Sequence, residues 1–136
     1  MFRVTTEPLN IQQANDLVKR PTDGAVVTFD GIVRNNFDGR PVLYLEYETY
    51  AAMAEKKLAD IGAEVQQKFA VGEIAMMHRI GRLEIGESSI VIAVAAPHRH
   101  AAFEVCAYAM DRVKADVPVW KKEFFADGAD HWVNQN

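Results

Sequence analysis

The range Ser89–Glu123 constrains the fold more than any other part of the chain. It begins with an unbroken apolar run, Ile90–Ala95, whose length and β-branched content are typical of a buried strand. Pro97 ends that run. The pattern then predicts a helix over about His100–Lys114 and a second strand around Val117–Lys122. We therefore expect a buried strand beside a long helix at the centre of the fold.

Three basic residues, His98, Arg99 and His100, crowd the start of this predicted helix. The helix dipole disfavours cations there, while the free backbone N–H groups attract anions. The cluster therefore indicates an anion site, and a chance group of exposed basic residues is an equal alternative. His98 and His100 are poor candidates for metal ligands, because no carboxylate or cysteine partner stands at ligand spacing.

Lys114 lies near the other end of the same predicted helix. It follows Phe103, Ala107 and Met110 at spacings of four, three and four, so we expect it to continue an apolar stripe. A cation that faces an apolar surface is costly unless an anion meets it, and an anionic substrate would do so. The plainer alternative is that a lysine in the last turn complements the helix dipole.

Two further cations are candidates for the same site. Lys121 alternates with Val117 and Val119, so it is expected on their face of the strand. Arg34 ends a predicted strand beside a loop rich in asparagine, where a solvated arginine is the more common outcome.

Composition excludes several functional classes. The 136 residues are expected to form one domain, residues 1–136, and carry a net charge of −4, which argues against a general role on nucleic acid or membrane surfaces. No apolar run approaches the ~20 residues that span a bilayer, and the first residues lack an apolar signal core, so a cytoplasmic protein is expected. The single Cys106 excludes an internal disulfide and is expected to be packed.

The rest of the chain alternates strands and helices. The expected strands are Phe2–Thr5, Ala25–Arg34, Val42–Glu48, Ile74–Arg79 and Leu83–Ile85, and the expected helices are Asn10–Lys19 and Ala51–Phe69.

Some details of this arrangement are also expected. Val42–Glu48 should form a hairpin with Ala25–Arg34, in which Gly31 indicates a bulge or a close backbone approach. Trp132 should be the last large anchor. The predicted fold class is α+β, with a largely antiparallel or mixed sheet and two main helices.

No common catalytic motif appears in the sequence. There is no P-loop, no dinucleotide-binding glycine pattern and no G-x-S-x-G. The residues alone support an anion-binding pocket with lysines able to do acid–base work, and they do not identify a reaction.

Five segments resemble one known family. They are GAVVTFDGIVRNN (Gly24–Asn36), LEYETYAAMAEKKL (Leu45–Leu58), HRIGRLEIGE (His78–Glu87), APHRHAAFE (Ala96–Glu104) and VPVWKKE (Val117–Glu123). In order and spacing they resemble the large, catalytic subunit family of molybdopterin synthase. The resemblance runs from about Gly24 to Trp132.

The resemblance implies a fold, an activity and a partner. The fold is a single α/β hammerhead-like domain that forms dimers. The activity is that of a sulfurtransferase in molybdenum cofactor biosynthesis, which converts cyclic pyranopterin monophosphate (precursor Z) into molybdopterin. Two sulfurs come from the C-terminal Gly-Gly thiocarboxylate of a small ubiquitin-like carrier subunit. The assembly implied is a heterotetramer around a central homodimer, and no cofactor or metal is implied.

Matched motif by motif, the resemblance also implies site residues. The catalytic lysine falls on Lys114 and a second pocket lysine on Lys121. Arg34, Phe29 and Met110 match the rest of the substrate pocket, and His98 and Arg99 match a basic pair contributed across the dimer interface. Some relatives carry another pocket arginine beyond the final tryptophan. This chain has none after Trp132, so either Arg40 or another basic residue replaces it, or the pocket works with fewer cations.

Two other functional classes remain open from the sequence. A non-catalytic dimeric scaffold subunit would share the fold without requiring all of these cations. A stand-alone enzyme that binds phosphate esters would need a metal or a nucleophile, and the sequence offers neither convincingly.

Overall fold

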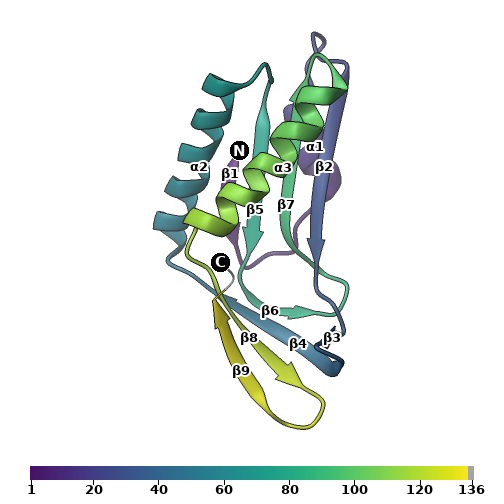
Figure 1. The fold of residues 1–136 in the computed structure, drawn as a ribbon, viewed down its shortest axis with the longest axis vertical. Helices are drawn as coiled ribbons and strands as arrows, with labels where there is room; N and C mark the ends of the chain where they lie inside the picture. Colours follow the sequence, from purple (N-terminus) through teal and green to yellow (C-terminus); the bar gives the residue numbers. More distant parts are fainter. Residues whose placement is uncertain (135–136) are drawn as a thin grey trace.

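A four-stranded β-sheet forms the centre of the computed structural model, which describes residues 1–134. Its strands are β1 (Phe2–Thr5), β5 (Ile74–Arg79), β7 (Ser88–Ala96) and β2 (Ala25–Ile32), in that spatial order (Figure 1). β1 runs parallel to β5, whereas the β5–β7 and β7–β2 pairs are antiparallel. The predicted buried strand is thus the central β7, and the predicted strand at Phe2–Thr5 is confirmed.

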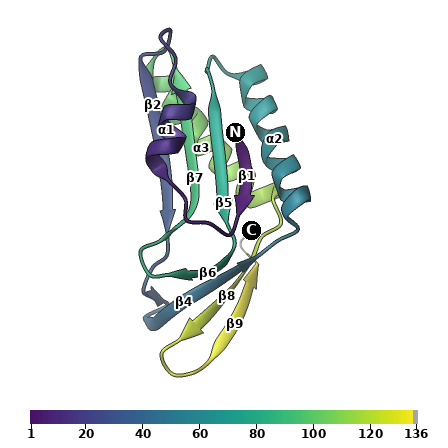
Figure 2. The same cartoon turned by 180° about the vertical axis from the view of Figure 1, so that it is seen from behind.

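Helices cover both faces of this sheet. α2 (Ala51–Lys68) and α3 (Arg99–Asp116) lie on one face, and α1 (Ile11–Val18) lies on the other (Figures 1 and 2). Successive residues of β7 point to opposite faces, so this strand supplies both cores. The residues that face α2 and α3 are Ile90, Ile92 and Val94, and those that face α1 are Val91, Ala93 and Ala95. This two-sided burial explains the unbroken apolar run in the sequence.

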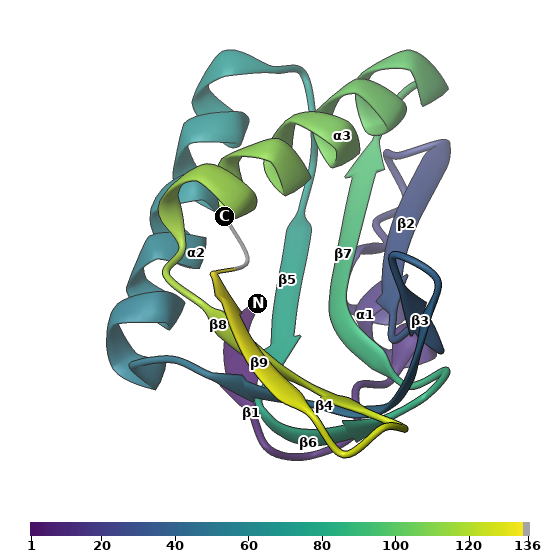
Figure 3. The ribbon, with the colours of Figure 1, turned by 60° about the horizontal axis from the view of Figure 1, so that its bottom comes forward.

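The second sheet crosses one end of the first. It contains β3 (Asn36–Phe37), β4 (Arg40–Glu48), β8 (Trp120–Phe125) and β9 (Asp130–Asn134), and β6 (Gly81–Glu84) also pairs with β4 (Figure 3). The two sheets and the helices confirm the predicted α+β class with two main helices. Within residues 1–134, no helix is both long enough and apolar enough to cross a bilayer.

The predicted hairpin between the second and third strands is wrong. β2 pairs with β7 along its whole length, from Ala25 opposite Ala96 to Ile32 opposite Ser88. β4 instead pairs with β3, β6 and β8 in the second sheet. Alternating apolar residues identify a half-buried strand, but they carry no information about which strand lies beside it.

Two expectations near the C-terminus also need correction. β8 begins at Trp120 instead of Val117, because Pro118 has no N–H to donate to a strand ladder. Val117 and Val119 are nevertheless buried, as predicted. Trp132 is not a core anchor, since it lies 45% exposed on β9 with its ring near the Lys122 ammonium.

Candidate active site

A cavity of about 360 Å³ lies where the two sheets meet the C-terminal half of α3. Its lining comes from β2, β4, β7, α3, β8 and β9 and from the residues that follow β2. Five residues proposed from the sequence line it together: Phe29, Arg34, Met110, Lys114 and Lys121. They are separated by up to 92 positions in the chain (121 − 29), so only the tertiary structure brings them together.

The end of β2 is shaped to direct Arg34 at this cavity. The strand register shifts between Gly31 and Ile32, so the irregularity predicted at Gly31 is present, and the extra residue of this bulge is Ser89 of β7. A Cβ atom at Gly31 would lie 2.7 Å from Cγ2 of Ile90, so the close approach of the strands excludes larger residues. Beyond the bulge, the Val33 N–H donates to the Glu87 carbonyl at 3.0 Å, which fixes the backbone next to Arg34.

Lys114 lines the cavity, but the reasoning that pointed to it is partly wrong. The predicted stripe does not face the core, because Phe103 is 62% exposed and Ala107 and Lys114 are also exposed. The buried face of α3 is instead formed by Ala102, Val105, Cys106, Ala109 and Val113. Helical periodicity gave the correct spacing but could not identify which row of residues faces the sheet.

Lys121 is the desolvated lysine of the site. It is half-buried on the inner face of β8, as the alternation with Val119 predicted. Burial lowers its pKa below the ordinary value for lysine, and the nearby charges of Lys114 and Arg34 lower it further, while Glu123 opposes the shift. An ammonium with a lowered pKa gives up its proton more readily, as acid–base catalysis near neutral pH requires.

Two residues that the sequence analysis did not identify complete this end of the site. Glu123 is 2% exposed and lines a narrow pocket of about 60 Å³ together with Arg34, Lys121 and Tyr47. Within residues 1–134, no hydrogen-bond donor reaches its Oε1 atom. Tyr47 borders both this pocket and the larger cavity. The only signal in the sequence is that both residues fall on the apolar face of their strands, where polar groups need a partner.

The basic pair at the start of α3 is not part of this cavity. His98 and Arg99 are exposed at the opposite end of the helix. The 15 residues from Arg99 to Lys114 correspond to roughly 22 Å along a helix axis. A single copy of the chain therefore does not bring the pair to Lys114. Arg40 is also elsewhere: its guanidinium pairs with Asp127 at 3.0 Å and lies 3.8 Å from the centre of the Phe125 ring.

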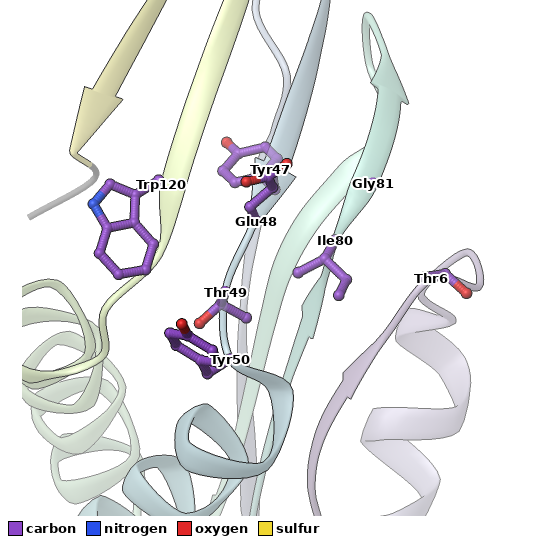
Figure 4. Close-up of a pocket in the computed structure, with 8 residues that line it drawn as sticks. All are labelled: Thr6, Tyr47, Glu48, Thr49, Tyr50, Ile80, Gly81 and Trp120. Carbon is purple, nitrogen blue, oxygen red and sulfur yellow. The ribbon is translucent and has the colours of Figure 1, made fainter.

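A second cavity of about 470 Å³ is larger and more apolar, and it lacks these cations. Its lining includes Trp120, Tyr50 and Ile80, and Tyr47 forms part of its wall (Figure 4). Of these two cavities, the larger is therefore not the one that gathers the charged side chains. We assign the anion chemistry to the smaller one, because basic groups from α3, from β8 and from the residues after β2 converge there.

The single cysteine is not suited to act as a nucleophile. Cys106 is buried on the core face of α3, as predicted. Burial raises the pKa of its thiol, which keeps it protonated.

Comparisons with known proteins identify the family of the chain. Residues 4–116 match the family model described as "MoaE protein". The chain is 48% identical to the molybdopterin synthase catalytic subunit of Halalkalibacterium halodurans, in an alignment that covers 97% of this chain and 84% of that protein. It is 45% identical to the protein of that name from Bacillus subtilis, covering 97% and 83%.

A solved structure supports the same family assignment. The crystal structure of molybdopterin synthase from Staphylococcus aureus superposes with a TM-score of 0.92 at 41% identity, covering 97% of this chain and 96% of that chain. The chain therefore belongs to the MoaE protein family.

Proposed function

We propose that this chain is the catalytic subunit of a cytoplasmic molybdopterin synthase. It transfers two sulfurs to cyclic pyranopterin monophosphate from the C-terminal thiocarboxylate of a small ubiquitin-like carrier. The names of its relatives support this proposal. The observation that carries it is the convergence of Arg34, Lys114 and Lys121 on one cavity beside Phe29 and Met110.

The chemistry of the cavity suits a phosphorylated pterin. Arg34 and the two lysines supply positive charge for the cyclic phosphate, and Phe29 and Met110 supply apolar surface for the ring system. Partial exclusion of water strengthens each of these charge interactions.

We assign different roles in the reaction to different residues of the cavity. Attack of the thiocarboxylate sulfur forms a C–S bond on the pterin side chain and breaks a C–O bond, whose oxygen leaves as water after proton transfer. Hydrolysis of the resulting thioester then breaks the bond to the carrier, which leaves as a carboxylate. The half-buried Lys121, with its lowered pKa, is suited to supply the proton. Lys114 is assigned to the carbonyl of the incoming carrier tail. The buried, protonated Cys106 is consistent with sulfur that arrives from a partner.

Reconstitution with the carrier tests this function directly. The purified chain is mixed with cyclic pyranopterin monophosphate, with or without a thiocarboxylated carrier, and the dithiolene product is measured. Product is expected only when the carrier is present. A Lys114→Ala variant is expected to fold normally and to lose about 10²-fold or more of the rate. A Lys56→Ala variant, altered at an exposed site on α2, serves as the control.

The two alternative functions give different results in the same experiment. A stand-alone enzyme for phosphate esters would turn over a phosphate ester without the carrier. A non-catalytic scaffold subunit would behave the same with or without Lys114. Either outcome contradicts the proposal.

We also propose that His98 and Arg99 act in the cavity of a second copy of the chain. In one copy they lie at the far end of α3 from Lys114. Phe103, 62% exposed, and the exposed Ala107 leave an uncovered row on the same helix, as a dimer contact requires. A two-fold dimer would bring the basic pair of one copy to the cavity of the other.

Mixing two inactive variants tests this shared site. Lys114→Ala and Arg99→Ala proteins are each expected to be nearly inactive. After subunit exchange, half of the dimers are mixed, and each mixed dimer has one site with both residues intact, so about a quarter of the wild-type activity should return. Activity that stays at the level of the separate variants would show that each site is built from a single copy.

A further inference from the structure

Tyr47 lies at the boundary between the two sheets and the two cavities. It is 6% exposed on β4, and its Cα partner across the strand pair is Lys121 on β8. In an antiparallel pair, directly opposed residues place their side chains on the same face. Tyr47 therefore borders the cavity that holds Lys121 and Arg34, while its other side contributes to the apolar cavity (Figure 4).

Two neighbouring hydroxyl groups connect Tyr47 to the other sheet. The phenol lies beside the side chain of Ser89, at the start of β7, and both residues line the smaller cavity. The Ser89 hydroxyl, which is 5% exposed, donates to the carbonyl of Gly31 at 3.1 Å. Gly31 stands at the register shift between β2 and β7, three positions before Arg34. The ring of Tyr47 also packs edge-on against His78, with 5.3 Å between the ring centroids.

We propose that Tyr47 is a positioning residue that fixes the spacing between Lys121 and Arg34, through its contact with Ser89 and the hydrogen bond from Ser89 to Gly31. Lys121 belongs to the second sheet and Arg34 follows a strand of the first, so their separation depends on how the sheets are joined. This set of contacts, called here the chain Tyr47–Ser89–Gly31, joins the strand opposite Lys121 to the part of β2 that precedes Arg34. This inference rests on the proposed function, because it assumes that the two cations hold one anionic substrate.

The environment of the phenol favours this role over proton transfer. Burial raises the pKa of Tyr47, the Ser89 hydrogen bond lowers it, and the Glu123 carboxylate raises it, with a net upward shift. The phenol therefore stays protonated and neutral at the pH of the cell. The charged groups that face it from β8 are Lys121 and Glu123, and the His78 ring faces it from β5.

The test uses single and double variants that remove the hydroxyl groups. Tyr47→Phe and Ser89→Ala are each expected to lower kcat/KM for sulfur transfer by about tenfold, because small displacements of binding groups are costly to the rate. The double variant should lose about the same factor, since each change breaks the same chain. The pH–rate profile should keep its shape. Tyr44→Phe, on the other face of β4, is the matched control and should behave as wild type.

A second measurement does not depend on sulfur transfer. Inorganic phosphate is titrated into each protein and followed by NMR, and its Kd is expected to rise about fivefold in both single variants and no further in the double variant. If wild type binds phosphate in this pattern without transferring sulfur, the proposed function fails while the positioning role stands. Wild-type kinetics and phosphate affinity in Tyr47→Phe would overturn the positioning role. Effects that multiply in the double variant, or a lost limb in the pH profile, would also overturn it.

Discussion

A Lys121→Met variant is expected to lose sulfur transfer by about 10²–10⁴-fold while its stability is unchanged or higher. The activity is lost because methionine keeps the length of the side chain but can neither carry positive charge nor transfer a proton. Most substitutions in an active site should not remove activity while leaving the stability of the fold unchanged or higher. The reason lies in the environment of this ammonium.

The stability effect follows from the direction of the pKa shift. The pKa of Lys121 is lower in the folded protein than in the unfolded chain, chiefly because of burial. Between the two pKa values the unfolded chain binds more protons, so the stability of the wild type rises with pH across that window. At any pH below the folded pKa, the cost of burying the charge is fully present. Methionine removes this cost.

Thermal unfolding and the reconstituted assay together check this expectation. The variant should unfold at the same or a higher temperature near neutral pH, and the rise of wild-type stability at alkaline pH should be weaker in the variant. Lys122→Met is the matched control: this neighbour pairs with Asp130 at 3.7 Å and lies outside both cavities, so near-normal activity is expected. A Lys121→Met protein that keeps full activity, or that unfolds well below the wild type, would contradict the assignment.

Leu58→Ala is expected to give the largest loss of stability, about 2–5 kcal/mol of the free energy of unfolding. Leu58 is 0% exposed on α2, among the side chains packed between the helices and the four-stranded sheet. Truncation removes buried apolar surface and leaves a cavity that the surrounding core fills only in part. A loss of this size is a large fraction of the stability of a domain of this length.

Denaturant unfolding monitored by circular dichroism measures the effect. Met53→Ala, on the same helix but 50% exposed, should change the free energy of unfolding by less than about 0.5 kcal/mol. Equal losses for the two substitutions would mean that α2 does not pack through the face that carries Leu58.

Local patterns in the sequence were sufficient to predict most of the elements. The apolar run of β7, the bulge at Gly31 and the long helices α2 and α3 depend on neighbouring residues, so they are visible in a linear sequence. The candidate residues of the site were also found from the sequence. The stripe that it shares with Phe103, Ala107 and Met110 indicated Lys114, although that stripe is not buried. Strand alternation indicated Lys121, and the family resemblance added Phe29 as a pocket residue and gave Met110 the same role.

Local patterns could not predict which strands pair when those strands are far apart in the chain. One partner of β4 is β8, whose residues lie 72 to 83 positions later in the chain than those they pair with, and no local property distinguishes β8 from β2. Tyr47 and Glu123 were missed for the same reason, because nothing within their own strands marks them as site residues. Their importance arises only from the cations that lie opposite them.

The sequence by itself determined which residues carry charge and which strands and helices they occupy, because these depend on side-chain chemistry and on the period of each element. The tertiary structure decided which face of α3 is buried, which strands pair, and that Arg34, Lys114 and Lys121 share one cavity. Contacts of this kind join residues distant in the chain, and their free energy depends on packing in three dimensions.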